Sequence, residues 1–170
     1  MGGDRKGSTS VLHSEDFGPE QRQSQFELGR DGPSTIVTGV DGSRTAMRAA
    51  AYAAGLARRQ SSRLVVVFVA TRPPVEGMSL GPAPLSIQEL FGETIAELRA
   101  EIERRHRELG IPITFEVRLG DPFTELKQAA ADARADVVVV GASESAGHRL
   151  IGSLAGRLVR AGRWPVTVVP

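Results

Sequence analysis

The chain has 170 residues, of which 41% are hydrophobic and 24% charged, with a formal net charge of +1 and no cysteine. This length suits one domain with a sizeable core, and the composition is that of a globular protein. The absence of cysteine excludes disulfides, thiolate metal sites and cysteine catalysis. The near-zero net charge gives no reason to expect a nucleic-acid partner.

Nothing in the sequence indicates a membrane protein. The longest apolar run, residues 64–70, is far shorter than the roughly 20 residues that a membrane-spanning helix needs. The first residues hold no apolar stretch of the kind found in signal peptides. We therefore expect no membrane contact and a cytoplasmic location.

The character of the sequence changes near residue 34. Residues 1–33 are rich in glycine, serine, glutamine and charged residues and show no sustained periodicity, which predicts a disordered tail. An alternative is a docking segment that binds a partner through Phe17 and Phe26. From residue 34 onward strand and helix patterns alternate, which predicts one domain over residues 34–170.

The first predicted strand is Thr35–Val40, where β-branched and apolar residues follow one another. Ser43 can cap the helix that follows, because its hydroxyl can accept a hydrogen bond from an amide of the first turn. This alanine-rich helix runs to about Arg59. Residues 64–70 form a continuous apolar run, which is typical of a strand buried on both faces.

A loop rich in proline and glycine separates this strand from a second predicted helix. Ser86 and Glu89 have the spacing of a capping box at the start of that helix, and Gly110 lies at its end. Apolar residues then alternate over Ile113–Leu119, which predicts a third strand. Asp121 and the proline after it have the order expected at the start of a third helix.

The last third of the chain repeats the pattern. Residues 137–140 predict a fourth buried strand, a leucine stripe predicts a fourth helix ending near Gly162, and Val166–Val169 predicts a fifth strand. Strands that alternate with helices form a parallel sheet covered on both faces. The sequence therefore predicts an α/β fold, in which ligands bind beyond the carboxyl ends of the strands.

The segment 141–153, directly after the fourth predicted strand, carries the strongest chemical signal. Its glycines are Gly141, Gly147 and Gly152, and its serines are Ser143, Ser145 and Ser153. Glycine lets the backbone approach a ligand closely, and the following helix points free amides toward the turn. This combination favours an anion such as phosphate. The alternative is an ordinary connection in which glycine only relieves backbone strain.

Several short motifs follow one another at a characteristic spacing. They are Val40-Asp41-Gly42-Ser43, Phe68-Val69, Gly120-Asp121-Pro122, the segment 141–153 and the ending 164–169. In this order, residues 34–170 resemble a universal stress protein domain. The resemblance implies a five-stranded parallel sheet with strand order 3-2-1-4-5, a role in the stress response, and a homodimer that pairs its last strands, here Val166–Val169. An apolar terminal strand at a sheet edge fits such pairing.

The resemblance also implies an adenine-nucleotide site for ATP, with Mg²⁺ bound alongside it. Asp41 matches the acid after the first strand, and Val69 matches a backbone contact at the end of the second strand. The phosphate turn of the family begins at the position of Gly141 and closes at the position of Gly152 and Ser153. The ordinary alternative for Asp41 is a turn acid that caps the first helix.

The turn departs from the family's pattern in two ways. Glu144 stands where the family has its second glycine, although Gly147 can replace that glycine. Seven residues separate Glu144 from Gly152, where the family's turn has nine, so the turn is two residues shorter. A carboxylate beside a triphosphate is repulsive unless Mg²⁺ or Arg149 intervenes.

Two functions follow from these observations. One is a dimeric nucleotide-binding regulator, and the other is a stress-response interaction module that binds no nucleotide. We expect no catalytic residues, and at most slow ATP hydrolysis or self-phosphorylation at a serine of the turn. No P-loop, dinucleotide-binding or nucleophile-elbow motif is present, and the three histidines have no metal-ligand spacing.

Overall fold

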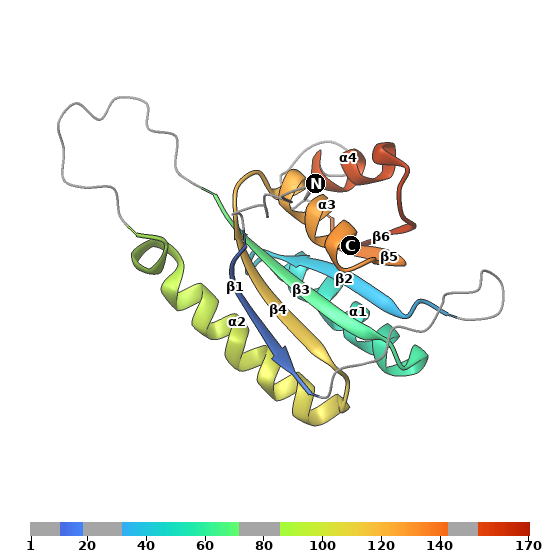
Figure 1. Ribbon diagram of the computed structural model, residues 1–170, viewed down its shortest axis with the longest axis horizontal. Helices are drawn as coiled ribbons and strands as arrows, with labels where there is room; N and C mark the ends of the chain where they lie inside the picture. The colour runs from blue at the N-terminus through green and yellow to red at the C-terminus, as the bar shows by residue number, and fades with distance from the viewer. Residues whose placement is uncertain (1–10, 19–31, 72–85, 143–152) are drawn as a thin grey trace, which may run out of the picture.

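The computed structural model describes residues 11–18, 32–71, 86–142 and 153–170, which form one mostly parallel sheet with helices on both sides (Figure 1). Within these ranges the strands are β1 Val11–Phe17, β2 Thr35–Val40, β3 Arg63–Ala70, β4 Ile113–Leu119, β5 Val137–Gly141 and β6 Val166–Val169. The helices are α1 Arg44–Gln60, α2 Ile87–Leu109, α3 Pro122–Asp132 and α4 Ser153–Ala161. None of the helices in the described ranges is long and apolar enough to cross a membrane.

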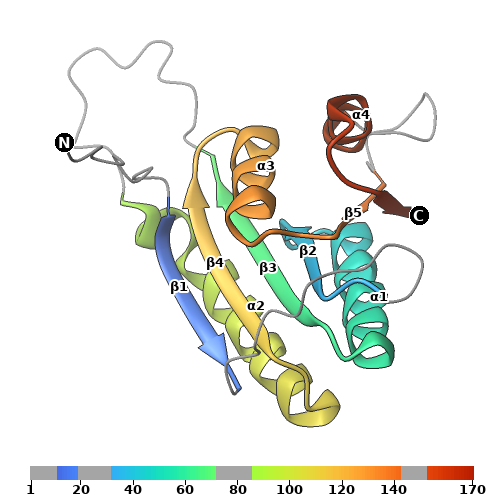
Figure 2. The same ribbon diagram turned by 45° about the vertical axis from the view of Figure 1, so that its right-hand side comes forward.

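Two layers of helices cover the sheet. Helices α1 and α2 lie on one face, and α3 and α4 lie on the other (Figure 2). Strand β3 shows why both faces need cover: Val66 and Phe68 belong to the core under α1 and α2, whereas Val65 and Val67 belong to the core under α3 and α4. The prediction that this strand is buried on both faces is confirmed.

The helix starts follow the predicted capping chemistry. The Ser43 hydroxyl accepts a hydrogen bond from the Ala46 amide at the start of α1. At the start of α2, Ser86 and Glu89 form the complete capping box, and Gly110 ends that helix in the left-handed conformation. Asp121 caps α3 and is followed by a proline in its first turn.

Within the described residues the sheet has six strands, in the order β1-β4-β3-β2-β5-β6, so the prediction of a five-stranded sheet is wrong. The predicted order 3-2-1-4-5 describes only the five parallel strands, from β4 at one side to β6 at the other. The sixth strand, β1, pairs antiparallel with β4 and covers the edge that β4 would otherwise expose.

Strand β1 lies inside the segment 1–33, for which we predicted a disordered tail, and at Val11–Phe17 that prediction is not met. Glu15 forms an ion pair with Arg99 of α2, and the Thr114 hydroxyl of β4 donates a hydrogen bond to Asp16. Phe17 packs against the core under α2. Phe26, the other residue of the possible docking segment, lies outside the described residues.

A buried charge cluster lies between β4 and α3. The Arg118 side chain is almost fully buried, with 1% of the residue exposed. Its Nε donates to Glu116 at 2.8 Å and its Nη2 donates to Asp132 at 3.0 Å. The Glu125 carboxylate lies 3.9 Å from Nη1. These carboxylates offset the cost of burying the guanidinium.

Candidate functional site

The candidate site lies where the strand order reverses, between β2 and β5. Pairing between these strands ends at Thr38 and Val139, whereas pairing between β2 and β3 continues to Val40 and Phe68. Beyond Thr38 the backbone of β2 is therefore no longer paired with β5. In open sheets of this type, ligands bind at the carboxyl ends of the strands beside such a switch point.

Asp41 follows β2 directly and is exposed. Its Oδ1 accepts a hydrogen bond of 2.9 Å from the Ser43 amide, and Gly42 between them has a φ of +85°. Asp41 therefore supports the turn that begins α1, as its ordinary interpretation predicts. Its Oδ2 has no hydrogen bond to the part of the chain that the structure describes, so this oxygen can accept one from a ligand.

Val69 lies near the end of β3, one residue beyond the last pair that β3 forms with β2. It still pairs with Arg118 on the β4 side. Its half-buried side chain packs toward α3 and α4. The backbone of Val69 thus lies near the carboxyl end of β3, beside the end of β2 that Asp41 follows.

Gly141 ends β5 and lies against the first turn of α1. A Cβ atom at this position would lie 2.6 Å from the Thr45 carbonyl carbon and 2.7 Å from the Ala46 nitrogen. These distances are far below van der Waals contact, so only glycine fits here without movement of α1. Gly141 therefore has a packing role that requires no ligand, and it also places the first turn of α1 beside the end of β5.

The rest of the predicted phosphate turn lies outside the described residues. This applies to Gly147 and Gly152, and also to Glu144 and Arg149. Ser153 begins α4, which places its backbone at the end of the turn. Of the six predicted site residues, the structure therefore brings Asp41, Val69 and Gly141 to the carboxyl ends of neighbouring strands. It also shows where the turn ends.

A contact that the sequence did not predict joins α4 to the start of α3. Arg157 of α4 forms an ion pair with Asp121, with both Nη–Oδ distances at 3.3 Å. The same guanidinium lies 4.1 Å from the centre of the Phe123 ring. Hydrogen bonds from the Thr124 amide and hydroxyl, together with Arg157, hold the pKa of Asp121 below its ordinary value.

This ion pair reduces the positive charge that is available to a ligand beside the turn. The sequence has four arginines after residue 147 and no acid, a pattern that favours an anion near the turn. Arg157 is instead engaged by Asp121, and Arg160 donates to the Gly156 carbonyl oxygen. Within the described ranges, no three His, Asp or Glu side chains come together as a metal site.

Most of the chain matches a known family. The sequence profile of the universal stress protein family matches residues 33–170. This chain belongs to that family. Universal stress protein MJ0531 of Methanocaldococcus jannaschii is 29% identical over 136 residues, which cover 79% of this chain and 80% of that protein.

Solved structures of the universal stress protein family have the same fold. A family member from Burkholderia pseudomallei is 27% identical and superposes with a TM-score of 0.64, covering 81% of this chain and 96% of its own. A universal stress protein solved in complex with cAMP is 26% identical, with a TM-score of 0.62 and coverage of 81% and 97%. The match with the family profile begins after β1, so this strand lies outside the matched domain.

Proposed function

We propose that this universal stress protein acts in the stress response as a regulator that binds an adenine nucleotide at the carboxyl ends of β2, β3 and β5. The observation that carries the proposal is the exposed Asp41 carboxylate at the switch point, with one oxygen directed to its own turn and the other without a partner in the described ranges. The relative solved with cAMP supports the choice of an adenine nucleotide.

Each residue has a role in this proposal. The free oxygen of Asp41 accepts hydrogen bonds from the ribose hydroxyls, and the backbone of Val69 contacts the adenine ring. The phosphates lie against the turn that begins at Gly141 and ends at Gly152 and Ser153, with Gly147 as the glycine between them. ATP brings Mg²⁺, which offsets the repulsion between Glu144 and the phosphates. The protein's role is binding, without residues for efficient catalysis.

The test is calorimetric titration of the native protein, Asp41→Asn and Asp41→Ala with Mg-ATP. The Oδ1 of asparagine can still accept a hydrogen bond from the Ser43 amide, so Asp41→Asn retains the turn. Its NH2 group takes the place of the free carboxylate oxygen and cannot accept a hydrogen bond from the ribose. Because a hydrogen bond to a charged group contributes about 1.5–3 kcal/mol, we expect both variants to bind at least about tenfold more weakly. The exposed Glu97→Gln on α2 is the control and should bind as the native protein does. Equal affinity of all four proteins would contradict the role of Asp41.

A second function is supported by the packing of Gly141. Its contact with α1 explains this glycine without any phosphate, and Glu144 and the shorter turn disfavour an anion. In this alternative the protein is a stress-response interaction module that binds no nucleotide. Absence of Mg-ATP binding by the native protein would favour it.

We also propose that the protein is a homodimer in the cytoplasm, paired through β6. Strand β6 pairs only with β5, so its other edge is open within the described sheet, and its four residues are half-buried. An uncovered edge of this kind pairs readily with a second copy. Light scattering at micromolar concentration should give twice the mass of one chain, and a monomer would contradict this assembly. We further propose that the universal stress protein domain spans residues 34–170, with β1 pairing to its sheet from the segment before it.

A further inference from the structure

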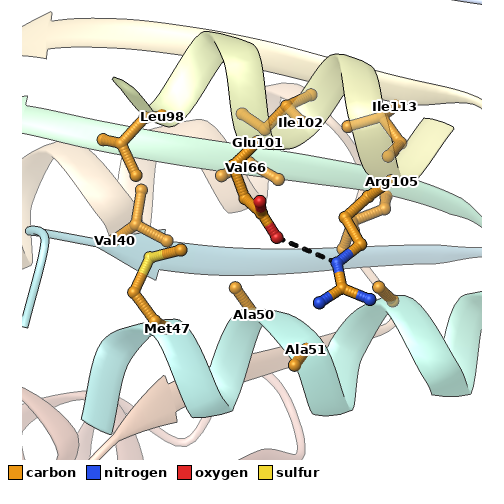
Figure 3. Close-up of a pocket in the computed structure, with 12 residues that line it drawn as sticks. Val40, Met47, Ala50, Ala51, Val66, Leu98, Glu101, Ile102, Arg105 and Ile113 are labelled. Carbon is orange, nitrogen blue, oxygen red and sulfur yellow. Dashed lines mark hydrogen bonds and ion pairs between the residues drawn. The ribbon is translucent and has the colours of Figure 1, made fainter. Parts of the chain in front are cut away.

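A cavity of about 160 Å³ lies between α1 and α2, on the face of the sheet opposite to α3 and α4 (Figure 3). Its floor includes Val66 of β3 and Ile113 of β4. One wall is formed by α2 through Leu98 and Ile102, and the other by α1. These side chains make the interior mostly apolar, and the cavity extends along the sheet from Ile113 at the start of β4 to Val40 at the end of β2.

The cavity exists because α1 presents small side chains toward α2. Ala50, Ala51 and Ala54 line it, and a methyl group does not reach across the space that a larger side chain would fill. Ala51 is exposed, so the cavity opens to solvent along this side of α1. A small molecule can therefore enter without unfolding of either helix.

The polar part of the wall is an ion pair on α2. The Arg105 Nε donates to Glu101 at 2.9 Å, and both side chains point from α2 toward α1 (Figure 3). Glu101 also accepts a hydrogen bond from Arg104. Burial acts to raise the pKa of Glu101, but the hydrogen bonds from Arg104 and Arg105 outweigh it and lower the pKa, so the carboxylate is ionised at neutral pH.

The ion pair of Glu101 and Arg105 restricts the ligand. Arg105 already pairs with this carboxylate, so the wall offers no unpaired charge to a charged ligand, whose burial beside an apolar interior would be unfavourable. A carboxylate has about four acceptor sites, so Glu101 can accept one more hydrogen bond in addition to those from the arginines. The matching ligand is neutral, has an apolar body and carries one hydrogen-bond donor.

We propose that this cavity binds a small neutral aromatic molecule that carries one O–H or N–H group, with the ring between α1 and α2 and the donor on Glu101. The size fits, because an apolar cavity of about 150 Å³ in another protein holds a benzene ring. The cavity lies between the sheet and helices α1 and α2, and it reaches Val40, the residue before Asp41. The proposed ligand does not depend on nucleotide binding.

The test is NMR of the full chain with labelled Ile, Leu and Val methyl groups, with phenol, toluene and benzoate as probes. Phenol should shift the methyl signals of Ile102 and Ile113 saturably and leave Leu126, in the opposite core, unchanged. Toluene, which has no donor, should bind more weakly than phenol, and benzoate should bind most weakly. Absence of saturable shifts with phenol, or toluene binding as tightly as phenol, would overturn the proposal.

Two pairs of variants locate the site. Ala50→Leu fills the cavity and should abolish the phenol shifts while leaving the midpoint of thermal unfolding equal or higher, whereas Ala131→Leu on the exposed face of α3 should leave phenol binding unchanged. Glu101→Gln should weaken phenol binding and strengthen benzoate binding, and Glu103→Gln on the same helix should do neither. Phenol shifts that persist in Ala50→Leu, or an unchanged order of probes in Glu101→Gln, would overturn the proposal.

Discussion

Replacement of Gly141 by alanine tests whether the close packing of β5 against α1 is a structural requirement. The added Cβ would lie 2.6 Å from the carbonyl carbon of Thr45 and 2.7 Å from the nitrogen of Ala46. Both are backbone atoms in the first turn of a helix, so neither can rotate away as the end of a side chain can. Overpacking of a rigid site costs about 1–3 kcal/mol, and we expect a value near the upper end, about 3 kcal/mol.

The assay is thermal and urea unfolding followed by circular dichroism. For a chain of this size, a loss of about 3 kcal/mol lowers the midpoint of thermal unfolding by about 6–12 °C. Gly55→Ala is the matched control, because a Cβ there meets only the flexible end of Arg59, at 3.4 Å, within α1. Alanine should stabilise that helix by about 1 kcal/mol. If Gly141→Ala were as stable as the native protein, the packing explanation of this glycine would be refuted.

Three further substitutions are predicted from buried or capping groups, and equilibrium unfolding measures each. The buried Thr38 Oγ1 has no hydrogen-bond partner in the described part of the chain. Thr38→Val should therefore leave the free energy of unfolding unchanged or raise it by about 1 kcal/mol. A clear decrease in the free energy of unfolding would show that the hydroxyl forms a hydrogen bond. Arg118→Met leaves Glu116 and Glu125 without their cation and should lower the free energy of unfolding by about 3–5 kcal/mol at neutral pH. Adding Glu116→Gln should restore part of this free energy, because it removes one of the unpaired charges. Asp121→Ala should cost about 1 kcal/mol at neutral pH through loss of the α3 cap. Because the folded pKa of Asp121 lies below its ordinary value of 3.8, this contribution to stability is fully present above that pH and is lost as the pH falls through the folded pKa. A stability difference between the native protein and Asp121→Ala that stayed constant into strong acid would contradict this role of Asp121.

The elements that the sequence predicted correctly are those specified by neighbouring residues. A cap such as Ser43 on α1, or Ser86 with Glu89 on α2, needs groups only three positions apart, so its chemistry is visible in the sequence. Strand β1 is different, because its residues are mostly exposed and include charged groups. It forms a strand by pairing with the open edge of β4, about 100 residues away, and that edge is not apparent from local pattern.

The candidate site shows the same division. The Asp41 turn is local, and its hydrogen bond to Ser43 agrees with the ordinary interpretation of that acid. The contact of Gly141 with α1 joins residues almost 100 positions apart, so the glycine signal alone could not separate packing from phosphate binding. The ion pair between Asp121 and Arg157 spans 36 positions and was missed for the same reason.

The most direct test of the proposed nucleotide site is calorimetric titration of the native protein with Mg-ATP, run in parallel with Glu144→Gly. The proposal predicts saturable binding of one nucleotide per chain by the native protein, and equal or tighter binding by the variant because a negative charge beside the phosphates is removed. Absence of binding by both proteins would contradict the nucleotide site and favour the interaction module.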